Sequence, residues 1–230
     1  MSKESEGSQL EWHAPHNPWL IAGVVTVSTF MEVLDGTIVN VSLPHIAGSL
    51  GATPIDSTWV LTSYLIANAI VLPLSAWFSS LFGRKNFYMA CVFLFTASSL
   101  LCGLAPSLGA LVLFRIIQGA GGGGLQPSTQ AIMVDTFPPQ KRGMGMAIYA
   151  MTVVVAPVIG PTLGGWITDN FTWRWIFLIN VPIGALSLLL TARFISDPPY
   201  LPRRSGPDKY RADFVGLGLL AVGLGCLQLV

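Results

Sequence analysis

The chain has 230 residues, of which 52% are hydrophobic and 10% charged, and its net charge at pH 7 is +1. Soluble domains usually carry about 25% charged residues, so this composition excludes an ordinary soluble domain. The near-neutral charge gives no basic surface for binding nucleic acid. Long apolar runs recur along the chain, and a helix needs about 20 such residues to cross a bilayer. We therefore expect an all-α polytopic membrane protein.

Seven apolar segments are separated by polar or Pro- and Gly-rich punctuation. They lie at 19–43, 58–82, 87–105, 108–134, 146–168, 175–195 and 214–230. Residues 1–18 are polar and lack the pattern of a cleaved signal peptide, which predicts a cytoplasmic tail. The first six segments predict a transmembrane bundle over 19–195, followed by a cytoplasmic linker at 196–213. The segment 214–230 is near the lower limit for crossing, and we interpret it as the start of a seventh helix in a truncated chain.

The distribution of Lys and Arg predicts the orientation, because cytoplasmic loops are enriched in these residues. If the N-terminus is cytoplasmic, ten of the twelve fall on the cytoplasmic side, Arg174 falls outside and Arg115 lies within a span. We therefore expect a multi-pass protein with a cytoplasmic N-terminus.

The first span contains polar residues that a lipid-facing helix would not carry. Glu32 and Asp35 are three residues apart, so both lie on one face of the helix, and Asn40 follows. A charged side chain near the bilayer centre costs about 2.5–3.5 kcal/mol on insertion scales, so such residues are usually functional. The fourth span adds Arg115 and, one turn later, Gln118. Arg115 either snorkels to the outer interface or, as we favour, pairs with an acid on a neighbouring helix.

Glycines and prolines mark two further spans. Gly119, Gly121 and Gly124 match G-x-G-x-x-G, but in the middle of a span this pattern favours close helix packing over nucleotide binding. In the fifth span, Ala156, Gly160 and Gly164 form a stripe of small residues. Two prolines within this stretch favour a kink and a mobile interface; they are Pro157 and Pro161. Three scattered cysteines predict no metal site; they are Cys91, Cys102 and Cys226.

Four motifs, in order, resemble the major facilitator superfamily, within its fourteen-helix drug:proton antiporters of the EmrB/QacA type. They are residues 34–44 (LDGTIVNVSLP), 115–123 (RIIQGAGGG), 160–165 (GPTLGG) and 173–182 (WRWIFLINVP). The resemblance associates the arginine of the second motif with proton coupling and the third motif with exporters. One motif departs from the family pattern G-x-L-A-D-R-x-G-R-K, because residues 76–85 read AWFSSLFGRK. Its gating end, Gly83, Arg84 and Lys85, is kept, but Ser80 replaces the acid thought to latch the two bundles.

The resemblance implies the first of two six-helix bundles around a midplane cavity, and proton-coupled multidrug efflux by alternating access in the bacterial inner membrane. Asp35, Glu32 and Arg115 would couple protons, and three polar side chains would line the cavity: Asn40, Gln118 and Gln126. The conformational motif would comprise Pro157, Gly160, Pro161, Gly164 and Gly165.

The expected partners are protons, the lipid bilayer and amphipathic, often cationic drugs, with a periplasmic adaptor protein and an outer-membrane channel as further partners. No cofactor is expected. Export of a specific metabolite or siderophore is the alternative function. A non-transporting membrane protein, such as an intramembrane enzyme, is a more remote alternative, since no zinc motif or nucleophile–base pair favours it.

Overall fold

The computed structural model describes residues 16–197, together with 216, 218–219, 222–223 and 226. Most of the polar tail, the linker and the seventh segment therefore lie outside the described residues. The ordered elements of the described part are all helical. They are α1 (Pro18–Leu50), α2 (Pro54–Ser57), α3 (Trp59–Phe82), α4 (Arg84–Gly103), α5 (Leu108–Gly122), α6 (Leu125–Thr136), the 3₁₀ turn η1 (Pro139–Lys141), α7 (Arg142–Asn170), α8 (Trp175–Leu178) and α9 (Asn180–Phe194).

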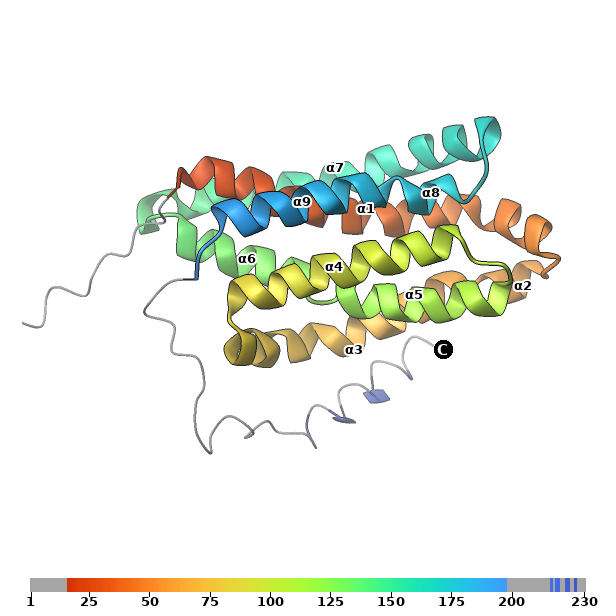
Figure 1. Cartoon of the computed structure of the whole chain (residues 1–230), viewed down its shortest axis with the longest axis horizontal. Coiled ribbons are helices and arrows are strands. Elements are labelled where there is room, and N and C mark those ends of the chain that lie inside the picture. Colours follow the sequence, from red (N-terminus) through yellow and green to blue (C-terminus); the bar gives the residue numbers. More distant parts are fainter. Residues whose placement is uncertain (1–15, 198–215, 217, 220–221, 224–225, 227–230) are drawn as a thin grey trace, which may run out of the picture.

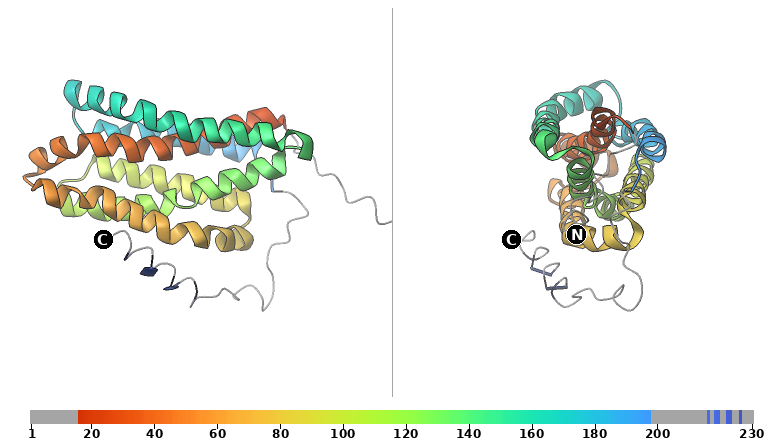
Figure 2. Two further views of the ribbon diagram at one scale, coloured as in Figure 1. Left: turned by 180° about the vertical axis from the view of Figure 1, so that it is seen from behind. Right: turned by 90° about the vertical axis from the view of Figure 1, so that its left-hand side faces the viewer.

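Among the described residues, six helical stretches are long and apolar enough to cross a membrane. They are α1, α2 with α3, α4, α5 with α6, η1 with α7, and α8 with α9. The six stretches run side by side along the long axis of the molecule (Figure 1), and the end-on view in Figure 2 shows them gathered into one bundle. We call its two ends the Gly83 end, where α3 turns into α4, and the Gly51 end, where α1 turns into α2.

Helix α1 is longer than the predicted span 19–43, because it continues through Pro44 to Leu50. Beyond the proline, Ile46 and Ala47 are buried, so packing keeps this last stretch helical although proline removes one backbone donor. The helix ends where Gly51 adopts a φ of 63°, a left-handed conformation that caps helices and suits glycine. The predicted end at Leu43 was therefore wrong by seven residues.

The fourth span, predicted as one segment over 108–134, consists of two helices separated by Gly123 and Gly124. Both glycines lie against neighbouring helices. A β-carbon at Gly123 would meet the backbone of Asn68 in α3, and one at Gly124 would meet Cys91 in α4. The two glycines allow this close packing, and because glycine is a poor helix former, the helix is interrupted where they lie.

Helix α7 packs against α1 over the most extensive interface of the bundle. Gly160 lies against Thr37 and Gly164 against Ile38, so the small-residue stripe faces α1 as close helix packing requires. Gly165, in contrast, has open space where a β-carbon would project. The prolines of the same motif are exposed within one unbroken helix; they are Pro157 and Pro161.

Two apolar clusters fill the bundle, and the polar residues of α1 lie where they meet. One cluster contains Val25, Met31 and Phe95. The other contains Leu34, Ile38 and Phe177. Because Met31 and Leu34 belong to different clusters, the turn of α1 that carries Glu32 crosses from one to the other.

Candidate functional site

Both acids of α1 lie inside the bundle, close to the middle of their helix. Asp35 is the eighteenth residue of the 33 in α1. Its exposed fraction is 1%, and that of Glu32 is 5%. A helix of this length spans about 50 Å, so neither side chain can reach the aqueous surface at either helix end. They therefore need partners within the bundle.

Asp35 is held by three donors from two other spans. Its Oδ2 accepts a hydrogen bond from Arg115 Nη1 at 2.5 Å, and this contact is also an ion pair. Its Oδ1 accepts from Gln118 Nε2 at 3.2 Å and from Asn180 Nδ2 at 2.9 Å. Asp35 on α1 is thereby joined to α5 and to α9. The predicted pairing of Arg115 with an acid on a neighbouring helix is present.

Arg115 is itself completely buried, with an exposed fraction of 0%, which excludes the snorkelling alternative. Its Nε donates to the Val60 carbonyl of α3 at 3.1 Å, and its Nη1 also donates to Gln118 Oε1 at 2.9 Å. The guanidinium lies over the Tyr64 ring, with Cζ 4.1 Å from the ring centroid, in a cation–π contact. Its Nη2 is buried without a hydrogen-bond partner.

Glu32 has a different environment, made of neutral donors. Its Oε1 accepts from the Tyr64 hydroxyl at 3.3 Å and from Asn68 Nδ2 at 3.2 Å, both on α3. Its Oε2 accepts from Gln126 Nε2 of α6 at 2.9 Å. Within the described residues, no cationic side chain lies within ion-pair distance of Glu32. The two acids share one face of α1, yet only Asp35 has its charge balanced there.

A chain of hydrogen bonds continues from Glu32 through α6 to α7. The Tyr149 hydroxyl donates to Gln126 Oε1 at 3.1 Å, and Gln130 Nε2 donates to the Tyr149 hydroxyl at 2.9 Å. Gln126 and Gln130 are both half-buried, so this chain leads from the buried carboxylate towards a more open side of the bundle.

The three predicted cavity residues have different surroundings. Gln126 contacts Glu32 and is half-buried. Gln118 is completely buried and belongs to the Asp35–Arg115 cluster, so it does not line an open surface in this conformation. Asn40 is exposed on α1, more than one turn beyond Asp35. Of these three residues, only Gln126 therefore joins a buried acid to a partly open surface.

The predicted gating loop, at the Gly83 end, is held by contacts with its own bundle. Gly83 has a φ of 87°, which turns the chain sharply between α3 and α4. Arg84 pairs with Asp135 at the end of α6 and donates to the Ala131 carbonyl at 3.2 Å. The Lys85 backbone amide donates to Asp197 Oδ1 at 2.7 Å.

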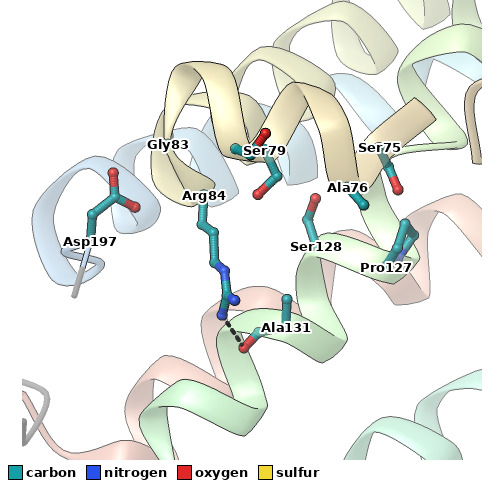
Figure 3. Close-up of a pocket in the computed structure, with 10 residues that line it drawn as sticks. Ser75, Ala76, Ser79, Gly83, Arg84, Pro127, Ser128, Ala131 and Asp197 are labelled. Carbon is teal, nitrogen blue, oxygen red and sulfur yellow. Dashed lines mark hydrogen bonds between the residues drawn. The ribbon is translucent and has the colours of Figure 1, made fainter. Parts of the chain in front are cut away.

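A pocket of about 270 Å³ lies beside this loop, between α3 and α6. Figure 3 shows Arg84 reaching Ala131 along its edge. Ser80, which replaces the acid of the family pattern, also lines the pocket and donates to the Trp77 carbonyl of its own helix.

Four residues around the two acids were missed in the sequence analysis: Tyr64, Asn68 and Asn180, which each contact an acid, and Tyr149, which contacts Gln126. Asn68 and Asn180 are polar residues within apolar segments, a signal that could have been followed. The tyrosines give no such signal, because a tyrosine in a span is also typical of packing or of the membrane interface. In the described residues, no group of three His, Cys, Asp or Glu side chains could hold a metal ion.

Comparison with known proteins decides the family. The sequence pattern of the Major Facilitator Superfamily matches residues 25–227. The chain belongs to this superfamily. Its relatives in the superfamily include the "Multidrug export protein EmrB" of Haemophilus influenzae, 47% identical over 211 residues, covering 92% of this chain and 40% of the relative. The "Fatty acid resistance protein FarB" of Neisseria gonorrhoeae is 45% identical, covering 89% of this chain and 39% of the relative.

Solved structures of major facilitator proteins agree in fold. The chain superposes on a peptide transporter, POT, with a TM-score of 0.72 at 16% identity, covering 91% of this chain and 45% of the other. The xylose transporter XylE from Escherichia coli gives a TM-score of 0.69 at 17% identity, covering 92% and 55%. The chain spans about 40% of the length of the curated relatives it matches. It is a multi-pass inner-membrane protein, and the matches named here are to transport and resistance proteins, not to enzymes.

Proposed function

We propose that this chain supplies the first six-helix bundle of a proton-coupled multidrug exporter that works by alternating access. The observation that carries the proposal is the pair of buried acids in the middle of α1, of which Asp35 is paired with Arg115 and Glu32 has only neutral donors. Buried acids in a membrane span are expensive to keep and mark proton or ion pathways. The similarity to multidrug export proteins supports the same function.

In this mechanism, Asp35 is the site that takes up and releases the coupling proton. In the conformation described here, Arg115 balances the ionised carboxylate, while Gln118 and Asn180 complete its hydrogen bonds. When the helices rearrange and Arg115 separates from it, a buried unpaired carboxylate is strongly disfavoured, so proton uptake accompanies the rearrangement. Separation and re-formation of this pair would thus link proton binding to the conformational cycle.

Glu32 would attract the drug in the same mechanism. A carboxylate with no cationic partner, reached through the half-buried Gln126, suits an amphipathic cation. One charge crossing a potential of 100 mV releases about 2.3 kcal/mol, and a tenfold concentration gradient costs about 1.4 kcal/mol. One proton could therefore sustain roughly a 50-fold gradient of a neutral substrate at that potential.

The proposal includes orientation and partners. The Gly83 end would face the cytoplasm, because Arg84, Lys85, Lys141 and Arg142 gather there. Gly160, Gly164 and the two prolines of α7 would let α7 move against α1 during the cycle. A periplasmic adaptor protein and an outer-membrane channel would complete an export path across the cell envelope.

Export of a specific metabolite, a siderophore or an amphipathic acid is the second candidate function. The 45% identity to a protein named for fatty acid resistance favours it. The uncompensated charge of Glu32 argues against an anionic substrate, because like charges repel in a low-dielectric site.

An efflux assay separates the two candidates. Cells that produce the complete encoded protein are loaded with ethidium, a cationic dye, or with a labelled fatty acid, and efflux is followed with and without a protonophore. Ethidium efflux that stops with the protonophore is the expected result. Fatty acid efflux without ethidium efflux would favour the second candidate, and efflux that resists the protonophore would contradict proton coupling.

A further inference from the structure

Tyr64 lies between the environments of the two acids of α1. Its hydroxyl donates to Glu32 Oε1 at 3.3 Å. The face of its ring lies against the Arg115 guanidinium, 4.1 Å from centroid to Cζ. The exposed fraction of Tyr64 is 3%, so both contacts are made inside the bundle. Tyr64 therefore contacts both Glu32, which has no cationic partner, and Arg115, which balances the charge of Asp35.

The backbone of α5 holds Tyr64 closely in this place. A β-carbon at Gly119 would overlap the Tyr64 carbonyl, and one at Gly122 would meet the Tyr64 hydroxyl at 2.8 Å. The two glycines lie one turn and two turns beyond Arg115 on the same helix. This tight fit leaves the ring little room to move unless one of its polar contacts is released.

The guanidinium of Arg115 is not fully satisfied in this arrangement. Its Nη2 is buried without an acceptor, and burying an unsatisfied donor is unfavourable, more so when the donor is charged. The contact with the Tyr64 ring face partly offsets this cost, since a cation–π contact is stronger when it is desolvated. The position of Arg115 opposite Asp35 therefore depends on where the Tyr64 ring lies.

We propose that Tyr64 is the positioning residue that couples the protonation of Glu32 to that of Asp35. When Glu32 is ionised, it accepts the hydrogen bond of the Tyr64 hydroxyl, and the ring is fixed under Arg115, which then balances ionised Asp35. When Glu32 binds a proton, its oxygen becomes a weaker acceptor, because hydrogen bonds to charged groups are about twice as strong as neutral ones. The ring is released, the hold on Arg115 weakens, and Asp35 takes up a proton more readily.

The groups around Glu32 allow this coupling to be distinguished from simple charge repulsion. The titratable or charged neighbours are Asp35 on α1, Tyr64 on α3, Arg115 on α5 and Tyr149 on α7, with Cys102 of α4 beside Gln118. Direct repulsion between two carboxylates has the opposite sign, since a proton on one makes a proton on the other less favourable. Uptake of two protons together therefore requires a link such as Tyr64.

Cationic drug binding would use the same link, so this inference rests on the proposed function. A cation reaches Glu32 from the side of Oε2 and Gln126, whereas Tyr64 and Asn68 contact Oε1. Drug binding stabilises ionised Glu32, and through Tyr64 and Arg115 it also favours ionised Asp35. Binding of one drug cation should therefore expel protons from both acids.

The test counts the protons released per dye bound, with purified complete protein, saturating ethidium and a pH indicator in weakly buffered solution from about pH 5.5 to 8. Two linked sites can release at most two protons, so we expect the maximum for the wild type to approach about two. Tyr64→Phe keeps the ring but removes the hydroxyl, and its maximum should fall to about one or below. Tyr88→Phe is the matched control, because its buried hydroxyl donates to the Val25 carbonyl, away from both acids, and it should match the wild type.

Each outcome decides a different claim. Equal proton counts from the wild type and Tyr64→Phe would overturn the role of Tyr64 while leaving the proposed function intact. An equal fall in Tyr88→Phe would also overturn it, because any buried tyrosine would then give the same effect. Ethidium binding to the wild type without proton release would contradict the proposed function itself, and the inference with it.

Discussion

Arg115 is the residue whose removal should most disturb the bundle. Arg115→Ala leaves Asp35 buried with the two amide donors of Gln118 and Asn180 and no balancing charge. Breaking a buried ion pair by removing one partner costs about 3–5 kcal/mol. We expect a clear loss of thermal stability in detergent, measured by size-exclusion chromatography after heating.

The double variant Arg115→Ala with Asp35→Asn is the control for this prediction. It removes both charges, so most of the stability lost by Arg115→Ala should return. If the double variant is as unstable as Arg115→Ala, lost packing against Tyr64 and Phe177, not the unpaired charge, is the cause.

At the scale of single residues, the sequence predicts contacts between charged residues better than contacts with neutral ones. Asp35 and Arg115 could be matched because each is a charged residue inside a span and both lie at similar depth. Asn180 and Tyr64 could not be assigned, because helical periodicity shows which residues share a face but not which helix packs against that face. The separate environments of Glu32 and Asp35, only one turn apart, depend on the same tertiary packing.

At the scale of the helices, the interface between α1 and α7 carries the next prediction. A β-carbon at Gly164 would lie 3.1 Å from the Ile38 carbonyl, whereas Gly165 has open space. Gly164→Leu should therefore push α7 away from α1 and lower efflux about tenfold or more, equivalent to at least about 1.4 kcal/mol. Efflux and membrane abundance are measured together in the complete protein.

Gly165→Leu is the matched control, since it places the same side chain one residue away in the same motif. We expect it to reduce efflux less than Gly164→Leu at equal abundance. Equal effects of the two variants would show that the motif acts through something other than contact with α1.

For the six spans that the structure describes, the order was predictable from apolar length and from the polar or Pro- and Gly-rich residues between segments, but the ends were not. The apolar run predicts an end at Leu43, whereas burial of Ile46 and Ala47 carries α1 on to Leu50. The break at Gly123 and Gly124 was not predicted from the glycine run, because these glycines are needed for close contact with Asn68 and Cys91 of other helices. Local sequence signals thus identify helices, and contacts between helices decide where they end.

For the whole molecule, the orientation in the membrane can be tested with exposed residues at opposite ends of the bundle. Gln140 lies within η1 at the Gly83 end, and Asn170 ends α7 at the Gly51 end; both are exposed. Single cysteines at these positions, in a background without other cysteines, should react differently with a membrane-impermeant reagent in intact cells. We expect labelling at position 170 and protection at position 140, and the reverse pattern would invert the orientation.

The fold of the bundle was predictable because four motifs occur in the family's order, and the family match and the superpositions confirm it. Residues 76–85, which depart from the family pattern, show that a motif does not predict contacts with other helices. With Ser80 in place of an acid, Arg84 is held by Asp135 of α6, a contact that no spacing in residues 76–85 predicts.

The central claim is that Asp35 carries the coupling proton and Glu32 attracts the drug. The most direct measurement compares Asp35→Asn and Glu32→Gln in the complete protein, reconstituted in vesicles with an imposed proton gradient, at matched abundance. Asp35→Asn keeps the shape of the side chain but removes the site that titrates, so proton-driven efflux should collapse for cationic and neutral substrates alike. Glu32→Gln should keep proton-driven efflux of a neutral substrate and weaken that of ethidium. Full proton-driven efflux by Asp35→Asn, with loss of all efflux in Glu32→Gln, would contradict the assignment.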